Sequence, residues 1–204
     1  ERLSAMAELA REKGGTLIVD EIYHGLVYEG EYTTAAAFAD DVFIINSFSK
    51  YFNMTGWRLG WMVAPERAVR ELDKLAQNLY LAAPTPAQHA ALAAFEPETL
   101  AILESRRQEF QARRDYLVPA LRGLGFDIPV MPQGAFYIYA GCRRLTQDSF
   151  GFARDLLEQA GVAITPGIDF GSNAPERHVR FAYTRPIAEL REGAARIANF
   201  LKKS

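Results

Sequence analysis

Residues 46–61 read NSFSKYFNMTGWRLGW, and this stretch decides how the rest of the chain is interpreted. Two short apolar runs, residues 42–45 and 59–64, flank its polar part, and both are typical of buried strands. Open α/β sheets bind their ligands in polar loops at the carboxyl ends of such strands. Lys50 and Arg58 are the cations of this loop, and hydroxyl groups stand beside the lysine. This combination suits an anionic ligand such as phosphate.

Other short motifs lie before and after this segment. They are DEIY at residues 20–23, PQGAFY at 132–137, PGIDFG at 166–171 and VRFA at 179–182. Together with SFSK and GWRLG, they resemble, in order, the landmarks of pyridoxal-phosphate (PLP) aminotransferases of classes I and II, the aspartate aminotransferase type with fold type I. The resemblance extends over essentially the whole chain.

The resemblance implies an α/β fold in two parts. Residues 1–96 would form the C-terminal portion of a large PLP-binding domain with a mostly parallel sheet and helices. Residues 97–204 would form a small C-terminal α+β domain. Because the family carries its first half upstream of this point, we expect the chain to be a C-terminal fragment. The opening residues agree, since they show a helical pattern without an initiator Met.

The resemblance also assigns the residues that would handle the cofactor ring. Lys50 would form the imine with the PLP aldehyde and move protons during the reaction. Asp20 would pair with the ring nitrogen and keep it protonated, so that the ring accepts electrons. Tyr23 would donate a hydrogen bond to the ring hydroxyl oxygen, although a tyrosine at a strand end is by itself more often a core residue.

Phosphate and substrate would be held by other polar side chains. Ser47 and Arg58 resemble the family's phosphate-binding pair, and a planar guanidinium can bind two phosphate oxygens at once. Ser49 either binds phosphate or caps the turn. Arg180 would bind the α-carboxylate of the substrate, a choice over Arg177 and Arg185 that depends on the resemblance alone.

The implied activity is transfer of an amino group between an L-amino acid and a 2-oxo acid, with PLP as cofactor. Two alternatives use similar sequence features: a PLP-dependent carbon–sulfur lyase on the same scaffold, and an aminotransferase-like effector domain of a transcription regulator. The upstream half of the family supplies further cofactor contacts, so we expect this chain alone to bind PLP weakly and to be inactive. Family members are usually homodimers, and we expect the same here.

The composition gives no sign of a nucleic-acid or membrane partner, and the resemblance implies small-molecule substrates. The chain has 204 residues with 23 basic and 25 acidic side chains, so its net charge of −2 favours neither nucleic acid nor an anionic membrane. No apolar run approaches the length of a membrane span. The single cysteine, Cys142, argues for a reducing compartment, hence a cytoplasmic protein, and we interpret it as an incidental thiol. No metal site is expected.

The apolar periodicity predicts specific elements along the chain. A helix opened by Pro65 should bury Val69, Leu72, Ala76 and Leu79, and a long helix should run over residues 99–124. Pro119 should kink or end that long helix, and its arginines should form a solvated face. Short apolar runs predict strands at residues 16–19, 135–140, 162–164 and 178–183.

Overall fold

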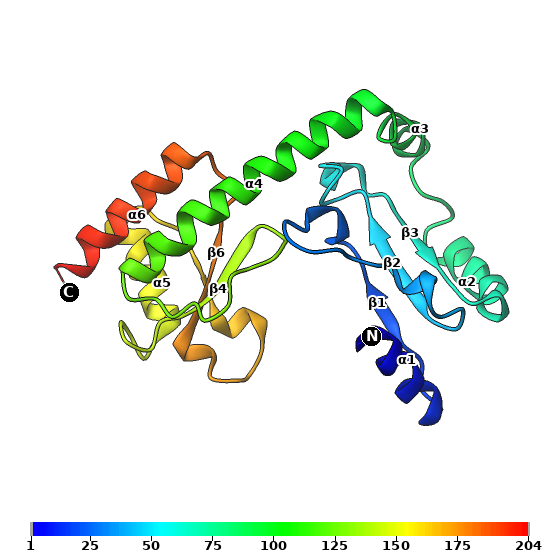
Figure 1. The fold of residues 1–204 in the computed structure, drawn as a ribbon, viewed down its shortest axis with the longest axis horizontal. Helices are drawn as coiled ribbons and strands as arrows, with labels where there is room; N and C mark the ends of the chain where they lie inside the picture. The colour runs from blue at the N-terminus through cyan, green and yellow to red at the C-terminus, as the bar shows by residue number, and fades with distance from the viewer. Residues whose placement is uncertain (1, 204) are drawn as a thin grey trace. The chain divides into compact units, whose positions relative to one another are not determined.

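The computed structural model describes residues 2–203, which divide into two compact units, Glu1–Arg107 and Gln108–Ser204. We call them unit 1 and unit 2. The division falls within helix α4 (Pro97–Gly123), drawn in green in Figure 1. The domain boundary expected from the sequence, between residues 96 and 97, lies where this helix begins.

Unit 1 is built on a three-stranded sheet in the order β1-β2-β3. Strand β1 (Ile18–Asp20) runs parallel to β2 (Phe43–Ser47), which runs antiparallel to β3 (Gly60–Val63). The helices of the unit are α1 (Arg2–Glu12), α2 (Glu66–Leu79), α3 (Thr85–Ala93) and the first part of α4. Mixed sheet and helices confirm the predicted α/β class.

Helix α1 and the segment after β1 cover one face of this sheet. Ala7, Ala35, Val42 and Ile44 form a buried cluster there. Residues alternate between the two faces of a strand, so Ile45 lies on the opposite face from Ile44. That opposite face is exposed: Ile18 is 65% exposed, and Ile45 and Met62 are also exposed. The prediction of buried strands is therefore wrong for this face.

Helix α2 begins after Pro65 as predicted, but its apolar side chains lack a covering layer. Leu72 and Ala76 are half-buried, whereas Val69 and Leu79 are exposed. No residue of the helix is buried. The expected inner face is therefore only partly covered within the part of the chain that the structure describes.

A second cluster holds the loop after β2 against α3. Phe48 and Met54 from the loop pack with Ala91 and Ala94, which are buried. The Phe48 ring also meets the Trp61 ring at 5.1 Å between centroids. This packing fixes both ends of the lysine-containing loop.

Unit 2 contains a second three-stranded sheet, antiparallel throughout, in the order β4-β6-β5. Its strands are β4 (Tyr137–Gly141), β5 (Thr165–Pro166) and β6 (His178–Ala182). Helices α5 (Ser149–Ala160) and α6 (Ile187–Leu201) complete the unit with the rest of α4. Its core is apolar and closed, formed chiefly by Leu117, Val118, Leu121, Ile138, Leu156, Val179 and Ile197.

The strand predicted at residues 162–164 is not formed. Gly161, with φ 64°, ends α5, and the N–H groups of Gly161 and Val162 donate to the carbonyls of Leu157 and Leu156. The backbone of this segment therefore completes a helix end instead of a sheet ladder. Strand β5 begins only at Thr165.

Helix α4 also differs from its predicted form. It continues through Pro119 to Gly123, so proline does not end it. Arg113 and Arg114 are buried, which contradicts the prediction of a solvated arginine face. Arg114 is 1% exposed and donates to the Pro132 carbonyl at 2.6 Å and to the Asp115 carboxylate. Buried guanidinium groups persist because their donors have such partners.

Candidate active site

One edge of the unit 1 sheet gathers the polar side chains predicted to act on the cofactor. Asp20 and Ser47 are the last residues of two parallel strands, and parallel strands end at the same edge. The Glu21 N–H donates to the Ile45 carbonyl at 2.8 Å and extends this pairing. Gly60, the first residue of β3, pairs with Ser47, which places the preceding Arg58 at the same edge. A carboxylate, a hydroxyl and a guanidinium thus share one sheet edge.

Lys50 sits in a tight turn stabilised by neighbouring hydroxyls. The Ser47 hydroxyl accepts from the Ser49 N–H at 3.0 Å and lies 2.9 Å from the Ser49 hydroxyl oxygen. The Thr55 hydroxyl donates to the Ser49 carbonyl at 2.6 Å. Lys50 is half-buried, and its Nζ lies 5.9 Å from the centroid of the Tyr23 ring. The turn therefore brings Lys50, Tyr23, Ser47 and Ser49 together.

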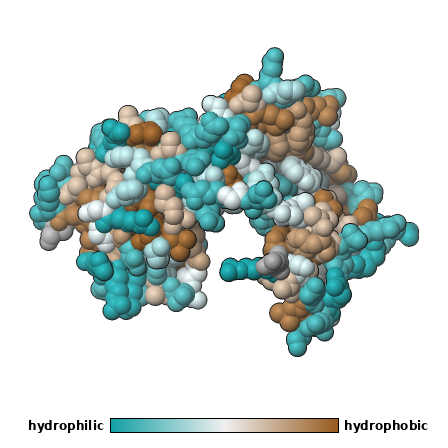
Figure 2. Space-filling model, in the orientation of Figure 1, coloured by the Kyte–Doolittle hydropathy of each residue, from teal (hydrophilic) through white to brown (hydrophobic). Residues whose placement is uncertain are grey.

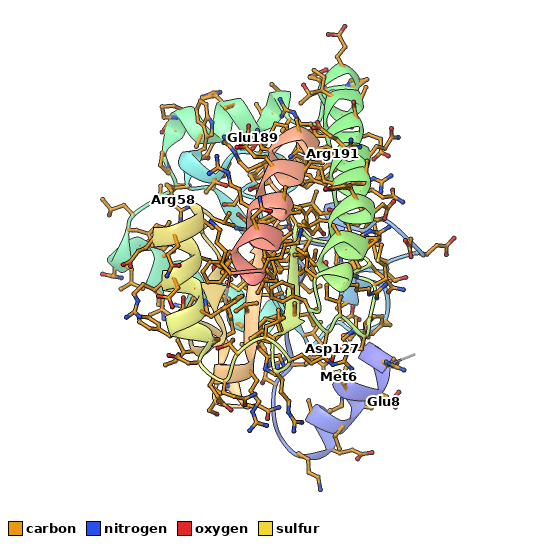
Figure 3. All side chains as sticks on the ribbon, turned by 90° about the vertical axis from the view of Figure 1, so that its left-hand side faces the viewer. Met6, Glu8, Arg58, Asp127, Glu189 and Arg191 are labelled. Atoms are coloured by element: carbon orange, nitrogen blue, oxygen red, sulfur yellow. The ribbon has the colours of Figure 1, made fainter. Side chains whose placement is uncertain are left out.

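Arg58, labelled in Figure 3, adopts the left-handed conformation with φ 54°. Its Nη1 donates to the Thr55 carbonyl at 2.9 Å. The guanidinium is exposed and forms no ion pair within residues 2–203. Two residues after Arg58, strands β2 and β3 lie very close together. A Cβ on Gly60 would lie 2.7 Å from the Asn46 carbonyl oxygen, so only glycine fits there. Arg58 thus offers hydrogen-bond donors at the sheet edge to an anion.

The adjacent carboxylates Asp20 and Glu21 have different environments. Glu21 is buried and accepts hydrogen bonds from the Ala35 N–H at 2.7 Å and the Thr34 hydroxyl at 3.1 Å. It also lies 3.3 Å from His24 Nδ1. Asp20 is exposed and accepts only from the Ile22 N–H, at 3.1 Å, among the hydrogen bonds of the described chain. Glu21 therefore stabilises the loop, and Asp20 is the carboxylate available to a ligand.

A cavity of about 570 Å³ adjoins the lysine turn in unit 1. Its walls include Ser47, Glu21, Tyr51 and Arg107. Burial, followed by the charge of Glu104, raises the pKa of the Tyr51 phenol. The Tyr51 ring packs on Gly25, where an added Cβ would lie 2.3 Å from Tyr51 Cγ. Tyr51 was not anticipated as a site residue, and its position next to Lys50 was the available signal.

Arg180 belongs to unit 2 and lies in β6, paired with Tyr139 of β4. Its guanidinium carbon lies 4.3 Å from the Phe170 ring centroid and 5.1 Å from that of Tyr137. Arg180 is half-buried and forms no ion pair with any described residue. These cation–π contacts hold the guanidinium group in place and leave its N–H donors for a carboxylate. Sequence reasoning missed Phe170 and Tyr137, although both lie within motifs that flank the strand.

Several side chains take no part in such a site. Cys142 is buried and unpaired, and burial raises the pKa of its thiol to about 11, which agrees with an inert thiol. Residues 2–203 contain no group of acidic, histidine or cysteine side chains that could hold a metal ion. Within the same residues, no helix combines the length and apolar character needed to cross a bilayer.

Solved structures similar to this chain include aminotransferases. The chain superposes on an aminotransferase from Mycobacterium tuberculosis with a TM-score of 0.95 and 38% identity, over 99% of this chain and 53% of that one. An aromatic aminotransferase from Pyrococcus horikoshii gives a TM-score of 0.90 and 31% identity, over 98% and 55% of the two chains. The fold is thus of the aminotransferase type.

Sequence comparison identifies the family of the chain. Residues 1–197 match the model of the aminotransferase class I and II family, and the chain belongs to this family. It is 39% identical to the valine–pyruvate aminotransferase of Mycobacterium tuberculosis over 98% of this chain and 52% of that protein. It is also 39% identical to the (5-formylfuran-3-yl)methyl phosphate transaminase of Methanocaldococcus jannaschii, over 96% and 52%. The chain therefore spans about half the length of these relatives.

Proposed function

We propose that the protein containing this chain is a PLP-dependent aminotransferase that moves an amino group between an L-amino acid and a 2-oxo acid. The observation that carries this proposal is the lysine turn at the sheet edge, where Lys50 lies beside Tyr23 and between the hydroxyl of Ser47 and the guanidinium of Arg58 along the chain. The relatives named above are aminotransferases or transaminases, which favours amino transfer over a lyase or a transcription regulator.

The donor set of this edge fits PLP. An exposed guanidinium without an ion pair in the described chain and two adjoining hydroxyls suit a phosphate group. The exposed carboxylate of Asp20, held by the Ile22 N–H, suits a protonated ring nitrogen. When bound, PLP supplies an electron sink that stabilises the negative charge left on the substrate carbon after proton loss.

Each residue then has a defined task. Lys50 would hold the cofactor aldehyde as an imine, with loss of water, and its Nζ would carry the proton that leaves the substrate carbon. Asp20 would keep the ring nitrogen protonated through a charged hydrogen bond. The Tyr23 hydroxyl would donate to the ring oxygen. Ser47 and Arg58 would hold the phosphate, and Ser49, whose N–H donates to the Ser47 hydroxyl, would support Ser47 in the turn.

Arg180 orients the substrate in this proposal. Its guanidinium forms a two-pronged pair with the α-carboxylate, and a fixed carboxylate sets the direction of the bond that loses its proton. The rings of Phe170 and Tyr137 support this guanidinium. Lys50 belongs to unit 1 and Arg180 to unit 2.

The proposal extends to the expectations that depend on the rest of the protein. The large PLP-binding domain would end near residue 96, with residues 97–204 as the small domain. The active protein would be a cytoplasmic homodimer. Relatives are about twice as long as this chain, so the chain alone should bind PLP weakly and lack activity.

Replacement of Lys50 tests the proposal. In the complete protein, Lys50→Ala should lower the rate of oxo-acid-dependent amino transfer by at least about 10²–10⁴-fold, the typical contribution of a positioned acid–base group. The matched control is Lys74→Ala, because Lys74 is an exposed lysine of α2 paired with Glu71. Borohydride reduction should attach PLP to the peptide that contains Lys50. Full activity of Lys50→Ala would refute the proposal.

A further inference from the structure

A cavity of about 390 Å³ in unit 2 has a basic lining that the proposed active site does not use. It lies where β4 ends and β6 begins, and none of the residues proposed to bind PLP or the substrate is among the described residues that line it. Its charged lining residues are Arg143, Arg144, Arg177 and Asp127, and His178 lies beside them. Figure 3 labels Asp127 at this end of the unit.

Two of the three guanidinium groups of this cavity lack a carboxylate partner. Arg143 and Arg144 are exposed, and neither forms an ion pair within residues 2–203. Arg177 is ion-paired with Glu176, whose Oε1 lies 3.3 Å from the buried Nε, although this Nε donates no hydrogen bond in the described chain. The Asp127 carboxylate forms no ion pair with these arginines in the described chain. The donors of Arg143 and Arg144 are therefore open to an external acceptor.

The backbone holds these arginines near one another. Cys142 N–H donates to the Arg177 carbonyl at 2.8 Å, and the Cys142 carbonyl accepts from Leu145 and Thr146 in the turn that carries Arg143 and Arg144. Asp127 and Gly141 exchange two backbone hydrogen bonds of 2.8 Å on the other side. The cavity is therefore formed before any ligand binds, which lowers the entropic cost of binding.

We propose that this cavity binds a small phosphorylated ligand. Three arginines and one aspartate line the cavity, and Glu176 pairs with one of these arginines, so the formal charge there is 3 − 2 = +1. A phosphate monoester is anionic at neutral pH and presents three acceptor oxygens, which Arg143 and Arg144 can share. A single carboxylate presents two oxygens, and one guanidinium fork occupies both. The guanidinium fork binds phosphate oxygens in pairs, and the volume lies in the ordinary range of small-molecule sites.

His178 provides a local readout of binding. Its ring stacks on Tyr139 at 5.1 Å between centroids, and its Nδ1 lies 2.9 Å from the Ala174 carbonyl oxygen. The other two histidines, His24 and His89, belong to unit 1. The ring signals of His178 in a proton NMR spectrum therefore report on this cavity separately from the proposed PLP site.

The experiment titrates the full chain with inorganic phosphate at constant ionic strength and constant pH, and follows the His178 signals. We expect a saturable shift. The Arg143→Gln/Arg144→Gln variant should weaken it at least about tenfold, since each charge-assisted hydrogen bond contributes about 1.5–3 kcal/mol. Asp127→Asn should tighten it several-fold, because it removes the only carboxylate among the described lining residues.

Two controls and one competing ligand make the result specific. Arg154→Gln/Arg185→Gln removes two exposed arginines outside the cavity, and it should leave the titration unchanged. Arg58→Gln removes the other guanidinium proposed to bind phosphate and should also have no effect on His178. The inference is wrong if phosphate gives no saturable shift, if Arg143→Gln/Arg144→Gln leaves it intact, or if succinate, a dicarboxylate, binds as tightly.

Discussion

The two units differ in how completely their apolar side chains are covered. In unit 2, α5 buries Phe152 and Leu156, and the centre of the sheet is inaccessible at Ile138 and Val179. In unit 1, every residue of β3 is exposed and α2 buries none. Figure 2 shows brown, apolar side chains at the surface around α3, where Leu92 and Phe95 are exposed.

This difference in burial shows which unit forms a hydrophobic core from its own residues. Unit 2 closes a core within its own residues, whereas the sheet of unit 1 has a parallel strand pair with one apolar face open. Parallel sheets are normally covered on both faces. We therefore expect this face to be covered in the relatives, which are about twice as long as this chain. Three predictions test the contrast, from the largest expected effect to the smallest.

Removal of a core leucine should have the largest effect. Leu156→Ala in α5 should lower the free energy of unfolding by about 2–5 kcal/mol, because Leu156 is inaccessible and its loss leaves a cavity. The matched change in unit 1, Leu79→Ala, should alter it by less than about 0.5 kcal/mol, because Leu79 is 75% exposed. Urea denaturation followed by circular dichroism measures both. Equal losses would contradict the contrast between the units.

Alkaline pH should weaken unit 2 through its thiol. The pKa of Cys142 rises from its ordinary value of 9.0 to about 11 in the folded chain, mainly through burial. Between these values the unfolded chain releases the thiol proton and the folded chain keeps it, so stability falls as pH rises. The slope is about 1.4 kcal/mol per pH unit.

The control for this effect is Cys142→Ala, which removes the thiol while leaving the other alkaline groups in place. Denaturation midpoints of both proteins at pH 8, 9, 10 and 11 isolate the cysteine contribution. Parallel pH profiles of the two proteins would show that burial does not protect the thiol.

A polar substitution on the exposed side of α2 should have the smallest effect on stability. Leu79→Gln should change the free energy of unfolding by less than about 0.5 kcal/mol, since the side chain is exposed in both states. It should nevertheless reduce the fluorescence of a bound apolar dye such as ANS, because exposed apolar surface binds the dye. Leu156→Gln serves as the opposite case and should destabilise the protein strongly. Unchanged dye binding by Leu79→Gln would count against exposed apolar surface on α2.

The sequence predicted most of this fold because its motifs lie at element ends. Apolar runs before Asp20 and before Ser47 placed two strands whose carboxyl ends meet. Proline placed the start of α2, which follows Pro65. These are local signals, and they require no knowledge of tertiary contacts.

The errors arose where tertiary contacts decide the outcome. The Arg113 and Arg114 side chains look solvated from their charged neighbours, yet the carbonyls of Thr184 and Pro132 accept their donors in the interior. Pro119 does not end α4, and Val118 and Leu121 near it are buried in the core, so packing holds the helix together there. Phe170 was not predicted to support Arg180, since strand and loop meet only after folding.

Helix α4 carries a consequence for attempts to divide the protein. Boundaries between compact regions commonly fall in flexible linkers, where proteases cut most readily. Here the boundary after Arg107 falls inside the helical stretch Pro97–Gly123, where main-chain amides are engaged in hydrogen bonds. Scission at that point requires local melting of the helix, so we expect a protease to cut slowly between the two units.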